Sequence, residues 1–535
     1  MSVKQAAAHS EVDERLAALM TNVNAVRAIA AAVEGTIGPK GLNTMLVDGF
    51  GGVTITNDGI TILEKMEASH PAARLVINTA KAQEDEVGDG TTTATIMAGT
   101  LVAEGFNQVV KGVPVTRVIE GIRRGVEGAL ASFADRVVAV EGLEDPRLKQ
   151  VALVAGREHA DIAELVVEAV RLTGPDKLRE PGFRLADAVT SEEGAGNEVF
   201  GGVIVDKEPL NDQMPKEVDG DVLVAVFDDA LEPDEVGDEA LATEAGFKKL
   251  LEYQADFRGN LAKLIGLGVK CLIVDRGVDD EAEDVLTDAG VMVLHRVSSR
   301  EWRKVAEHCG ARPLKRAALR KPAVELEGYL GRATRVWLDE KLEHVRLSGG
   351  RAKPQATILV GAATREVVAE RERIAQDAAA AVQSAFLGGL IAGGGACELA
   401  AVPELRRLRA ELRGMAAYGL DCVVEALRRP MGQIVHNAGF NALEKVGEVE
   451  SRQGAEGNGD LGVDCDSGEV VDMMAAGVID PADVKTHALR AAGEIATAIL
   501  RIDTIIKKRE EGQAGAAPGG DTAAGGKGAS GFDLT

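Results

Sequence analysis

The sequence predicts a multidomain α+β protein, and three observations support this fold class. Its 535 residues are enough for several domains with large cores. Helical periodicity dominates both ends of the chain, and short apolar runs alternate with helical stretches between about 211 and 355, as in an α/β domain. An economical interpretation is that the two helical ends form one domain and that the α/β region is an insertion in it.

The first predicted helix runs from Glu11 to Glu34, where apolar side chains recur at steps of three and four residues. Gly35 and the GPKG turn at 38–41 are expected to end it. Two strand-like runs, TMLVD and VTIT, come next, and NDG at 57–59 is expected to turn the chain as in a hairpin. Helices are expected from there to about residue 140.

After a mixed region at 145–200, the chain contains a series of strand-like runs. They are GGVIVDKE at 201–208, VLVAVF at 222–227, KCLIVD at 270–275 and VMVLHRV at 291–297. The helical pattern returns at Thr364 and continues to ILRIDTIIKK at 499–508. Residues 511–531 are polar and rich in Gly and Ala, which predicts a disordered tail.

The composition argues against several classes of function. Lys and Arg number 60 and Asp and Glu 85, and the net charge of −25 argues against a nucleic-acid-binding protein. No apolar run approaches the roughly 20 residues of a membrane span, and the N-terminus lacks the apolar core of a signal peptide, so we expect a cytoplasmic protein without a membrane partner. The scattered cysteines are expected to be reduced core thiols rather than zinc ligands: Cys271, Cys309, Cys397, Cys422 and Cys465.

The stretch VGDGTTTATIMAG at 87–99 is the first candidate site. We expect a loop that enters a helix, with Asp89 as N-cap and with Thr91, Thr92 and Thr93 in the first turn. Such a turn offers backbone N–H groups, hydroxyls and the positive end of the helix, which together suit a phosphate. A carboxylate beside a phosphate is useful if Mg²⁺ lies between them. The stretch lacks the lysine of a Walker A motif, and an ordinary capped helix is the alternative.

Other glycine-rich and acidic stretches have both a structural and a functional interpretation. TIGPKG at 36–41 fits a helix C-cap, and TNDG at 56–59 fits a hairpin turn. The glycines of IAGGGACE at 391–398 let a ligand approach the backbone closely, although a hinge would look the same. Asp377, in an alanine-rich helix, is either solvated or a water-activating carboxylate aimed at a neighbouring domain. Asp480 precedes a proline, where it can start a helix or accept hydrogen bonds from ribose hydroxyls.

Taken in order, these stretches resemble the chaperonins, and among them the archaeal and eukaryotic (group II) subunits of the thermosome class. The matching stretches span residues 36–506 and are GPKGLNTMLVD, VTITNDGITIL, VGDGTTTA, GVIVDKE, AGGGACE, GEVVDMMAAGVIDPADVKTHAL and ILRIDTII. So many motifs in the same order do not agree by chance. The chain is therefore identified as a member of this family, in the form of a divergent paralogue.

The resemblance implies three domains. They are an equatorial ATPase domain at 1–142 and 393–535, an intermediate hinge domain at 143–208 and 357–392, and an apical polypeptide-binding domain at 209–356. A helical protrusion that serves as a built-in lid is implied at about 229–257, where Phe247, Leu250 and Leu251 form an apolar stripe. The stripe either packs in a core or, if exposed, contacts substrate chains or neighbouring lids.

The resemblance also implies the partners and cofactors. The chain would assemble with itself or with paralogous subunits into a double ring of about eight or nine subunits per ring. The rings would enclose non-native polypeptides, and no separate lid protein is expected. ATP and Mg²⁺ would drive the cycle, and the sequence leaves open whether K⁺ is also required.

Family roles are carried to this chain residue by residue. The resemblance implies phosphate contacts for Gly38 and Pro39, Mg²⁺ binding for Asp89, and phosphate binding for Gly90, Thr91, Thr92 and Thr93. It implies that Asp58 lies near the γ-phosphate and the attacking water, and that Asp377 activates this water. It assigns the lining of the nucleotide pocket to Gly394 and Gly395 and the ribose contact to Asp480. Because Asp377 belongs to a domain that moves, hydrolysis is expected to wait for domain closure.

The chain also departs from the family pattern. The segment at 151–165 is shortened and lacks the lysine with which group II members sense the γ-phosphate, and Arg157 is the nearest cation that could replace it. The usual Arg-Gly-Gly turn is weakened at 358–368, and the protrusion is unusually acidic. The alternative function is therefore a structural or regulatory subunit of a mixed ring that hydrolyses ATP weakly, which the intact acidic residues oppose. A metabolic ATP-dependent enzyme has little support, because no second cluster of His, Cys or acidic residues marks a small-molecule site.

Overall fold

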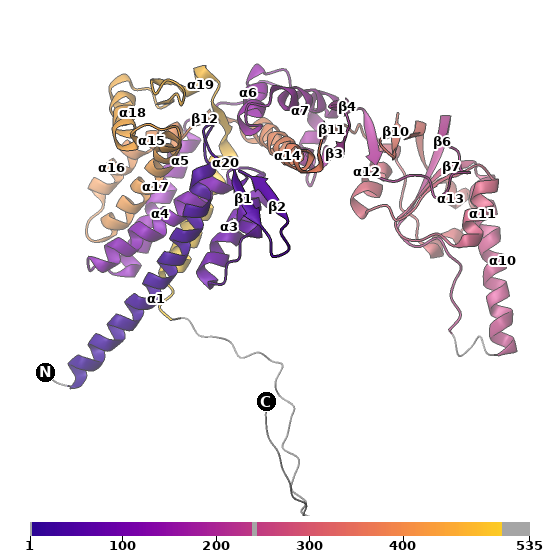
Figure 1. The fold of residues 1–535 in the computed structure, drawn as a ribbon, viewed down its shortest axis with the longest axis horizontal. Helices are drawn as coiled ribbons and strands as arrows, with labels where there is room; N and C mark the ends of the chain where they lie inside the picture. Colours follow the sequence, from indigo (N-terminus) through magenta and orange to yellow (C-terminus); the bar gives the residue numbers. More distant parts are fainter. Residues whose placement is uncertain (1–2, 238–242, 505–535) are drawn as a thin grey trace, which may run out of the picture.

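The computed structural model describes residues 3–237 and 243–504, which form three units. Figure 1 shows that the first and last described parts of the chain lie in one helical body, that an α/β unit lies on the far side of the molecule, and that a smaller middle unit connects them. The helical body and the middle unit each have a hydrophobic core, and the α/β unit has two. This architecture agrees with the multidomain α+β class that the sequence predicts.

The helical body is built from the first and the last parts of the chain. Its first part contains α1 (Val3–Val33), η1 (Glu34–Thr36), β1 (Thr44–Val47), β2 (Val53–Thr56), α2 (Gly59–Lys65), α3 (Pro71–Val87), α4 (Thr91–Val110) and α5 (Val115–Ala134). Its last part contains β12 (Leu390–Ala392), α15 (Ala396–Ala400), α16 (Val402–Glu411), α17 (Ala416–Asn437), α18 (Ala442–Glu456), β13 (Leu461–Val463), β14 (Val470–Asp472), α19 (Met473–Ala476), β15 (Ile479–Pro481) and α20 (Ala482–Leu500). Helices α4 and α5 both pack against α17 and α20, so segments far apart in the sequence share one core.

Small residues bring these helices close together. A Cβ on Gly121 of α5 would collide with the backbone of Ala416 and Gly419 at the start of α17, and a Cβ on Gly419 would collide with Val118 of α5. Aromatic residues make up only 3% of the chain, so the core consists mainly of Ala, Val, Leu and Ile. Close backbone approach compensates for the small volume of these side chains, because protein interiors are densely packed.

The two strands predicted near residue 50 form an antiparallel hairpin, with Thr44 opposite Thr56 and Val47 opposite Val53. The sequence NDG does not turn this hairpin, so that prediction is wrong. Asp58 is instead the N-cap of α2, because its carboxylate accepts hydrogen bonds from the backbone N–H groups at the start of that helix.

The middle unit contains one long helix, a helical pair and a small sheet. Its elements are α6 (Pro146–Ala155), α7 (Ala160–Thr173), α8 (Pro175–Leu178), η2 (Leu185–Ala188), β3 (Val189–Glu193), β4 (Glu198–Phe200), β11 (Thr357–Ala362) and α14 (Arg365–Gly388). The amide of Gln383 on α14 accepts a hydrogen bond from Leu185 N at 2.7 Å and donates to the carbonyl oxygens of Leu178 and Phe183. These bonds attach the segment between α8 and η2 to the long helix.

The α/β unit has a mixed six-stranded sheet in the order β5-β10-β9-β6-β7-β8. Its elements are β5 (Gly202–Val205), β6 (Glu217–Phe227), α10 (Glu244–Gly266), β7 (Val269–Val274), α11 (Asp280–Asp288), β8 (Met292–Leu294), α12 (Ser299–Cys309), η3 (Arg316–Arg320), α13 (Ala323–Glu327), β9 (Gly331–Asp339) and β10 (His344–Ser348). Strands β6, β7 and β8 are parallel and contain the predicted apolar runs, which are almost continuously buried because both faces of the sheet are covered.

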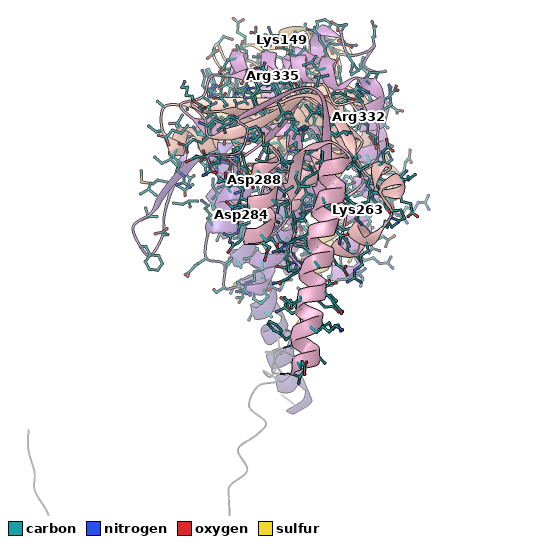
Figure 2. All side chains as sticks on the ribbon, turned by 90° about the vertical axis from the view of Figure 1, so that its right-hand side faces the viewer. Lys149, Lys263, Asp284, Asp288, Arg332 and Arg335 are labelled. Carbon is teal, nitrogen blue, oxygen red and sulfur yellow. The ribbon has the colours of Figure 1, made fainter. Side chains whose placement is uncertain are left out.

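Helix α10 extends the α/β unit. Figure 2 shows it running beyond the sheet, with Lys263 on its inner part. Lys263 Nζ donates to the carbonyl oxygens of Leu319 and Lys321, which anchors this end of the helix. Towards the outer end, Phe247 is 56% exposed and Leu251 51% exposed, whereas Leu250 is half-buried. Two of the three residues of the apolar stripe are therefore surface residues rather than core residues.

Some predicted features lie outside the described residues, namely the disordered tail at 511–531 and positions 238–242 of the expected protrusion. In the part of the chain that the structure describes, none of the helices is both long enough and apolar enough to cross a bilayer. All five cysteines have free thiols, and four of them are buried.

Candidate functional site

The GDGTTT stretch forms a glycine loop that leads into α4. Gly90 is the N-cap, with φ +81°, so the prediction that Asp89 caps the helix is wrong. The Asp89 carboxylate accepts a hydrogen bond from Gly90 N at 2.5 Å. Within the described residues, the first turn of α4 has no side-chain cap. Its backbone N–H groups and the positive end of the helix therefore suit an anionic ligand.

Asp58 lies beside this helix start. It is 8% exposed, and its Oδ2 accepts hydrogen bonds from the backbone N and the hydroxyl of Thr61 at 3.0 and 2.6 Å. A Cβ on the next residue, Gly59, would collide with the Thr92 hydroxyl and lie 3.1 Å from the Thr91 hydroxyl. The start of α2 thus touches the start of α4, and this contact brings Asp58 next to the threonines of the predicted phosphate site.

Asp377 reaches the same region from α14. A Cβ on Gly88, which ends α3, would lie 2.5 Å from the Cβ of Ala380, so α14 packs directly against the end of α3. Asp377 lies one turn earlier on α14. Its Oδ2 is 3.9 Å from Nη2 of Arg157, and Nη1 of Arg157 donates to Glu370 Oε1 at 3.3 Å.

Burial raises the pKa of Asp377 well above its usual value, and Asp58 and Glu84 raise it further. Arg157 acts in the opposite direction, because a nearby cation favours the carboxylate. In this conformation the proton therefore stays on Asp377 above the pH at which an exposed aspartic acid loses it. A nearby cation would favour the carboxylate form of Asp377, as Arg157 already does.

The pKa values of two other acids of the site are raised as well. Burial raises the pKa of Asp89 to about 6, and Asp480 adds to the effect. Burial raises the pKa of Glu84 to about 7, with contributions from Asp58 and Asp89. The mutual repulsion of these carboxylates means that a bound cation would lower their pKa values and be held strongly.

A second part of the site lies where the last part of the chain meets the first. Strand β12 pairs with β15, with Ile391 opposite Asp480. A Cβ on Gly393 would lie 3.1 Å from Asp480 Oδ1, so the glycine turn leaves the backbone open beside this carboxylate. Gly394 and Gly395 have φ of +61° and +82°, and Gly395 is the N-cap of α15.

The GPKG turn has a less direct connection to the carboxylates. Asn437 on α17 donates to the carbonyl oxygens of Glu34 and Ile37 at 3.0 and 2.9 Å, and Gly38 packs against Ile434 of the same helix. The preceding element η1 packs against α4. These contacts place Gly38 and Pro39 on the α17 side of the site, and the described contacts of the turn include neither Asp58 nor Asp377.

Sequence reasoning missed residues that hold the site together. Gln83 is fully buried, and its Nε2 donates to the backbone oxygens of Asp89 at 2.7 Å and of Val484 at 3.3 Å. Its Oε1 lies 2.5 Å from Nδ1 of His487, which must carry a proton because an amide oxygen only accepts. Glu84 was also missed, and the acidic run EDE at 84–86, one residue before GDGTTT, was the available signal.

The residues present fit a magnesium ion that is shared with a phosphate. Among the described residues, no group of three or more His, Cys, Asp or Glu side chains forms a complete metal site. Mg²⁺ is commonly held by one or two carboxylates together with phosphate oxygens and water. Asp89 next to the uncapped start of α4 offers this kind of partial coordination, and Asp58 and Thr91 lie close to it.

Comparisons with known proteins give the family. The model of the TCP-1/cpn60 chaperonin family matches residues 29–510. The chain is 33% identical to thermosome subunit beta of Archaeoglobus fulgidus over 523 residues, which cover 93% of this chain and 94% of the relative. It is 33% identical to thermosome subunit 3 of Haloferax volcanii, covering 91% of this chain and 94% of the relative.

A solved structure agrees with these sequence matches. The crystal structure of a group III chaperonin in the open state superposes with a TM-score of 0.83 and 45% sequence identity, covering 92% of this chain and all of that chain. This neighbour confirms the multidomain α+β chaperonin fold expected from the sequence. From the family model, the relatives and the shared fold, we conclude that the chain belongs to the TCP-1/cpn60 chaperonin family as a group II-type subunit.

Proposed function

We propose that this chain is an ATP-dependent chaperonin subunit that hydrolyses ATP to drive lid closure over non-native polypeptide in a double ring. The observation that carries the proposal is the convergence of three remote acids. Asp58, Asp89 and Asp377 come from different parts of the chain and meet at the uncapped start of α4. A catalytic phosphate site needs this combination of anion-binding backbone, metal carboxylate and general base.

The chain's residues would share the work as follows. The start of α4, with Gly90, Thr91, Thr92 and Thr93, would bind the phosphates, and Asp89 would hold Mg²⁺ beside them. When bound, Mg²⁺ would neutralise charge on the phosphate oxygens. Asp58 would orient the attacking water, and Asp377 would accept its proton. Gly38, Pro39, Gly394 and Gly395 would line the nucleotide pocket, and Asp480 would accept hydrogen bonds from the ribose.

Arg157 would make the activity of this site depend on the position of the middle unit. It lies in the middle unit with Asp377 and favours the charged form of both Asp377 and Asp89. We therefore propose that it replaces the missing lysine of the family as the residue that senses the γ-phosphate. Hydrolysis would then depend on movement of the middle unit against the helical body.

The hydrophobic cores support a division of the chain into three domains. We propose an equatorial domain at 1–142 and 393–535, an intermediate domain at 143–208 and 357–392, and an apical domain at 209–356. The residues of the four hydrophobic clusters support this division, since each cluster falls almost entirely within one of these domains. Free thiols in the core are compatible with a reducing, cytoplasmic location.

Exposed apolar surface supports assembly and client binding. On the hairpin of β1 and β2, Met45, Val47 and Ile55 are at least half exposed, and Phe50 at its tip is fully exposed. Such a surface needs a partner in solution, and a second subunit of the same or a paralogous type is the occupant we propose. The exposed Phe247 and Leu251 of α10 would contact non-native chains or neighbouring lids.

A second candidate function is a weakly hydrolysing subunit of a mixed ring. The lysine missing from 151–165 favours it, since the family uses that residue to sense the γ-phosphate. ATP turnover by the purified oligomer tests both candidates, with Asp89→Ala and Asp377→Ala as comparison variants. Turnover that depends on both acids supports the ATPase, whereas nucleotide binding without turnover supports the weakly hydrolysing subunit. The absence of nucleotide binding contradicts both.

A further inference from the structure

Lys485 lies at the centre of a buried group of three charges. Its Nζ is 2.8 Å from Oε1 of Glu398 and 2.8 Å from Oδ2 of Asp480. The Lys485 side chain is 7% exposed, Glu398 is fully buried, and Asp480 is 19% exposed. The three residues come from α20, α15 and β15, so the lysine connects α15, which follows the glycine turn, with the strand that carries Asp480.

The lysine keeps its charge in this position. Burial opposes the ammonium form, but Asp480 and Glu398 more than offset burial and raise the pKa of Lys485. One cation therefore compensates part of the charge of two buried acids. Without it, Glu398 and Asp480 would be left as two carboxylates without a counter-ion, which is unfavourable in a low-dielectric environment.

This ion pair also decides how Asp480 is presented. Its Oδ2 is bound to Lys485, and its Oδ1 lies beside Gly393, where a side chain would come within 3.1 Å. The fixed Oδ2 leaves the carboxylate few orientations, and Oδ1 is left facing the open backbone of the glycine turn. A carboxylate held in this way is ready to accept hydrogen bonds from a ligand's hydroxyl groups.

We infer that Lys485 is a positioning residue that holds Asp480 toward the ribose and so makes the site selective for nucleotides with vicinal ribose hydroxyls. The inference rests on the proposed function, because it assumes that the ligand is a nucleotide. A site that is built to hydrogen-bond a hydroxyl rejects an analogue that lacks it, since the polar group of the site is then left unpaired. Lys485 contributes by holding the Asp480 carboxylate in one orientation toward the ribose hydroxyls.

A variant of Glu398 can distinguish the positioning role of Lys485 from a merely structural role. If the lysine only joins α15 to α20, loss of its bond to Glu398 should disturb the site as much as loss of its bond to Asp480. If it positions Asp480, only the second bond matters for ribose selectivity. Glu398→Gln neutralises Glu398 and so removes one of the two ion pairs of Lys485, and it leaves the pair of Lys485 and Asp480 in place.

The test compares the affinities of Mg-ADP and Mg-2′,3′-dideoxy-ADP for the intact oligomer by calorimetry. The wild type is expected to prefer ADP by about 10- to 100-fold. Lys485→Met and Asp480→Asn should reduce this preference to about threefold or less, and Lys485→Arg should restore part of it. Glu398→Gln should retain the preference. Lys177→Met should also retain the preference for ADP. This variant removes an equally buried lysine from α8 of the middle unit.

The outcomes separate the inference from the proposed function. A wild type that binds neither nucleotide overturns the proposed function and the inference with it. If the wild type binds ADP selectively and Lys485→Met is equally selective, only the inference is overturned. Loss of selectivity in Glu398→Gln to the same extent as in Lys485→Met also overturns it. If Lys485→Met fails to fold, the double variant Glu398→Gln/Lys485→Met, in which neutral groups replace the buried pair, must lose the selectivity.

Discussion

Nη2 of Arg157 lies 3.9 Å from Oδ2 of Asp377. Arg157 belongs to the loop that joins α6 to α7, and Asp377 belongs to α14. Arg157 and the next residue, Glu158, both have left-handed backbones, with φ of 52° and 64°. This conformation costs roughly 1–2 kcal/mol for a residue other than glycine. The surrounding structure must therefore maintain it, and Arg157's bonds to Glu370 and Asp377 are contacts that can do so.

Replacement of Arg157 by Ala should slow turnover more than it weakens nucleotide binding. The cation favours the charged form of Asp377, and its loss raises the pKa of that group further. We expect kcat to fall about 100-fold, as for removal of one preorganised charge-stabilising group. The pH at which turnover reaches half its maximum should also move upward. Arg157→Lys should retain part of the activity. ATPase assays from pH 6 to pH 9 measure both effects.

Glu158→Gly is the matched control for this loop. It relieves a left-handed residue without removing the guanidinium, so we expect normal turnover and an unchanged pH profile. If Arg157→Ala and Glu158→Gly reduce turnover equally, the loop acts through its backbone and not through the charge of Arg157.

Asp377→Ala should bind ATP as the wild type does but lose about 10²- to 10⁴-fold in turnover, the usual contribution of a general base. Nucleotide binding by calorimetry and steady-state ATPase assays separate the two steps. Gln376→Ala, one position earlier on α14, is the control, because its amide bonds to Glu372 and not to the acids of the site. Retained hydrolysis in Asp377→Ala would show that another group takes the proton.

Binding of Mg-ADP should weaken as the pH falls. Asp89 has a pKa of about 6 and Glu84 a pKa of about 7, so both take up protons between pH 7.5 and pH 5.5. A bound cation lowers both values, so binding must expel these protons. For Asp89 alone, the change in charged fraction predicts about a fourfold loss of affinity over this range.

Calorimetry in buffers of different ionisation enthalpy counts the protons released. Asp89→Asn should abolish most of the affinity, and Glu84→Gln should bind with fewer protons released than the wild type. The nucleotide's own protonation is the same for every variant, so the difference between them isolates the protein groups. Equal proton release by Glu84→Gln and the wild type would contradict the coupling of Glu84 to the site.

The arrangement of helices and strands could be predicted from the sequence because the spacing of apolar residues indicates which side chains are buried. In α1 the apolar residues at steps of three and four, from Leu19 to Val33, are buried, and so are most residues of the apolar runs of β6, β7 and β8. The role of NDG was not accessible from local pattern, since Asp-Gly suits a hairpin turn and a helix start equally well. The helix start is selected only by the packing of α2 against α4.

The supporting residues of the site were out of reach for a different reason. Gln83 bonds to Val484, and Lys485 bonds to Glu398, so each has a partner far away in the sequence. A buried polar side chain looks in the sequence like an exposed one until its partner is known. Lys485 lies within one of the matching stretches, but the spacing of that stretch does not show which residues the lysine contacts.

Assembly should depend on the exposed hairpin of β1 and β2. Phe50→Asp places a charge on a fully exposed apolar tip, which a free subunit tolerates but an apolar contact with a second subunit does not. Light scattering should show a shift from a large oligomer to smaller species. Leu443→Asp at the start of α18, where the side chain is 88% exposed, should leave the oligomer intact. An unchanged oligomer in Phe50→Asp would remove the hairpin tip from the interface.

Client binding should depend on the outer part of α10. Phe247 and Leu251 are both about half exposed, and burial of a large apolar side chain against a partner is worth about 1.5–3 kcal/mol. The double variant Phe247→Ser/Leu251→Ser should therefore bind a chemically unfolded protein at least about tenfold more weakly, with unchanged ATPase activity. Suppression of aggregation and direct binding of a labelled unfolded chain measure this effect. Lys248→Ser/Glu252→Ser removes two exposed charges of opposite sign from the same helix turns and should bind normally. Equal loss in both double variants would mean that α10 acts through its fold or charge and not through its apolar stripe.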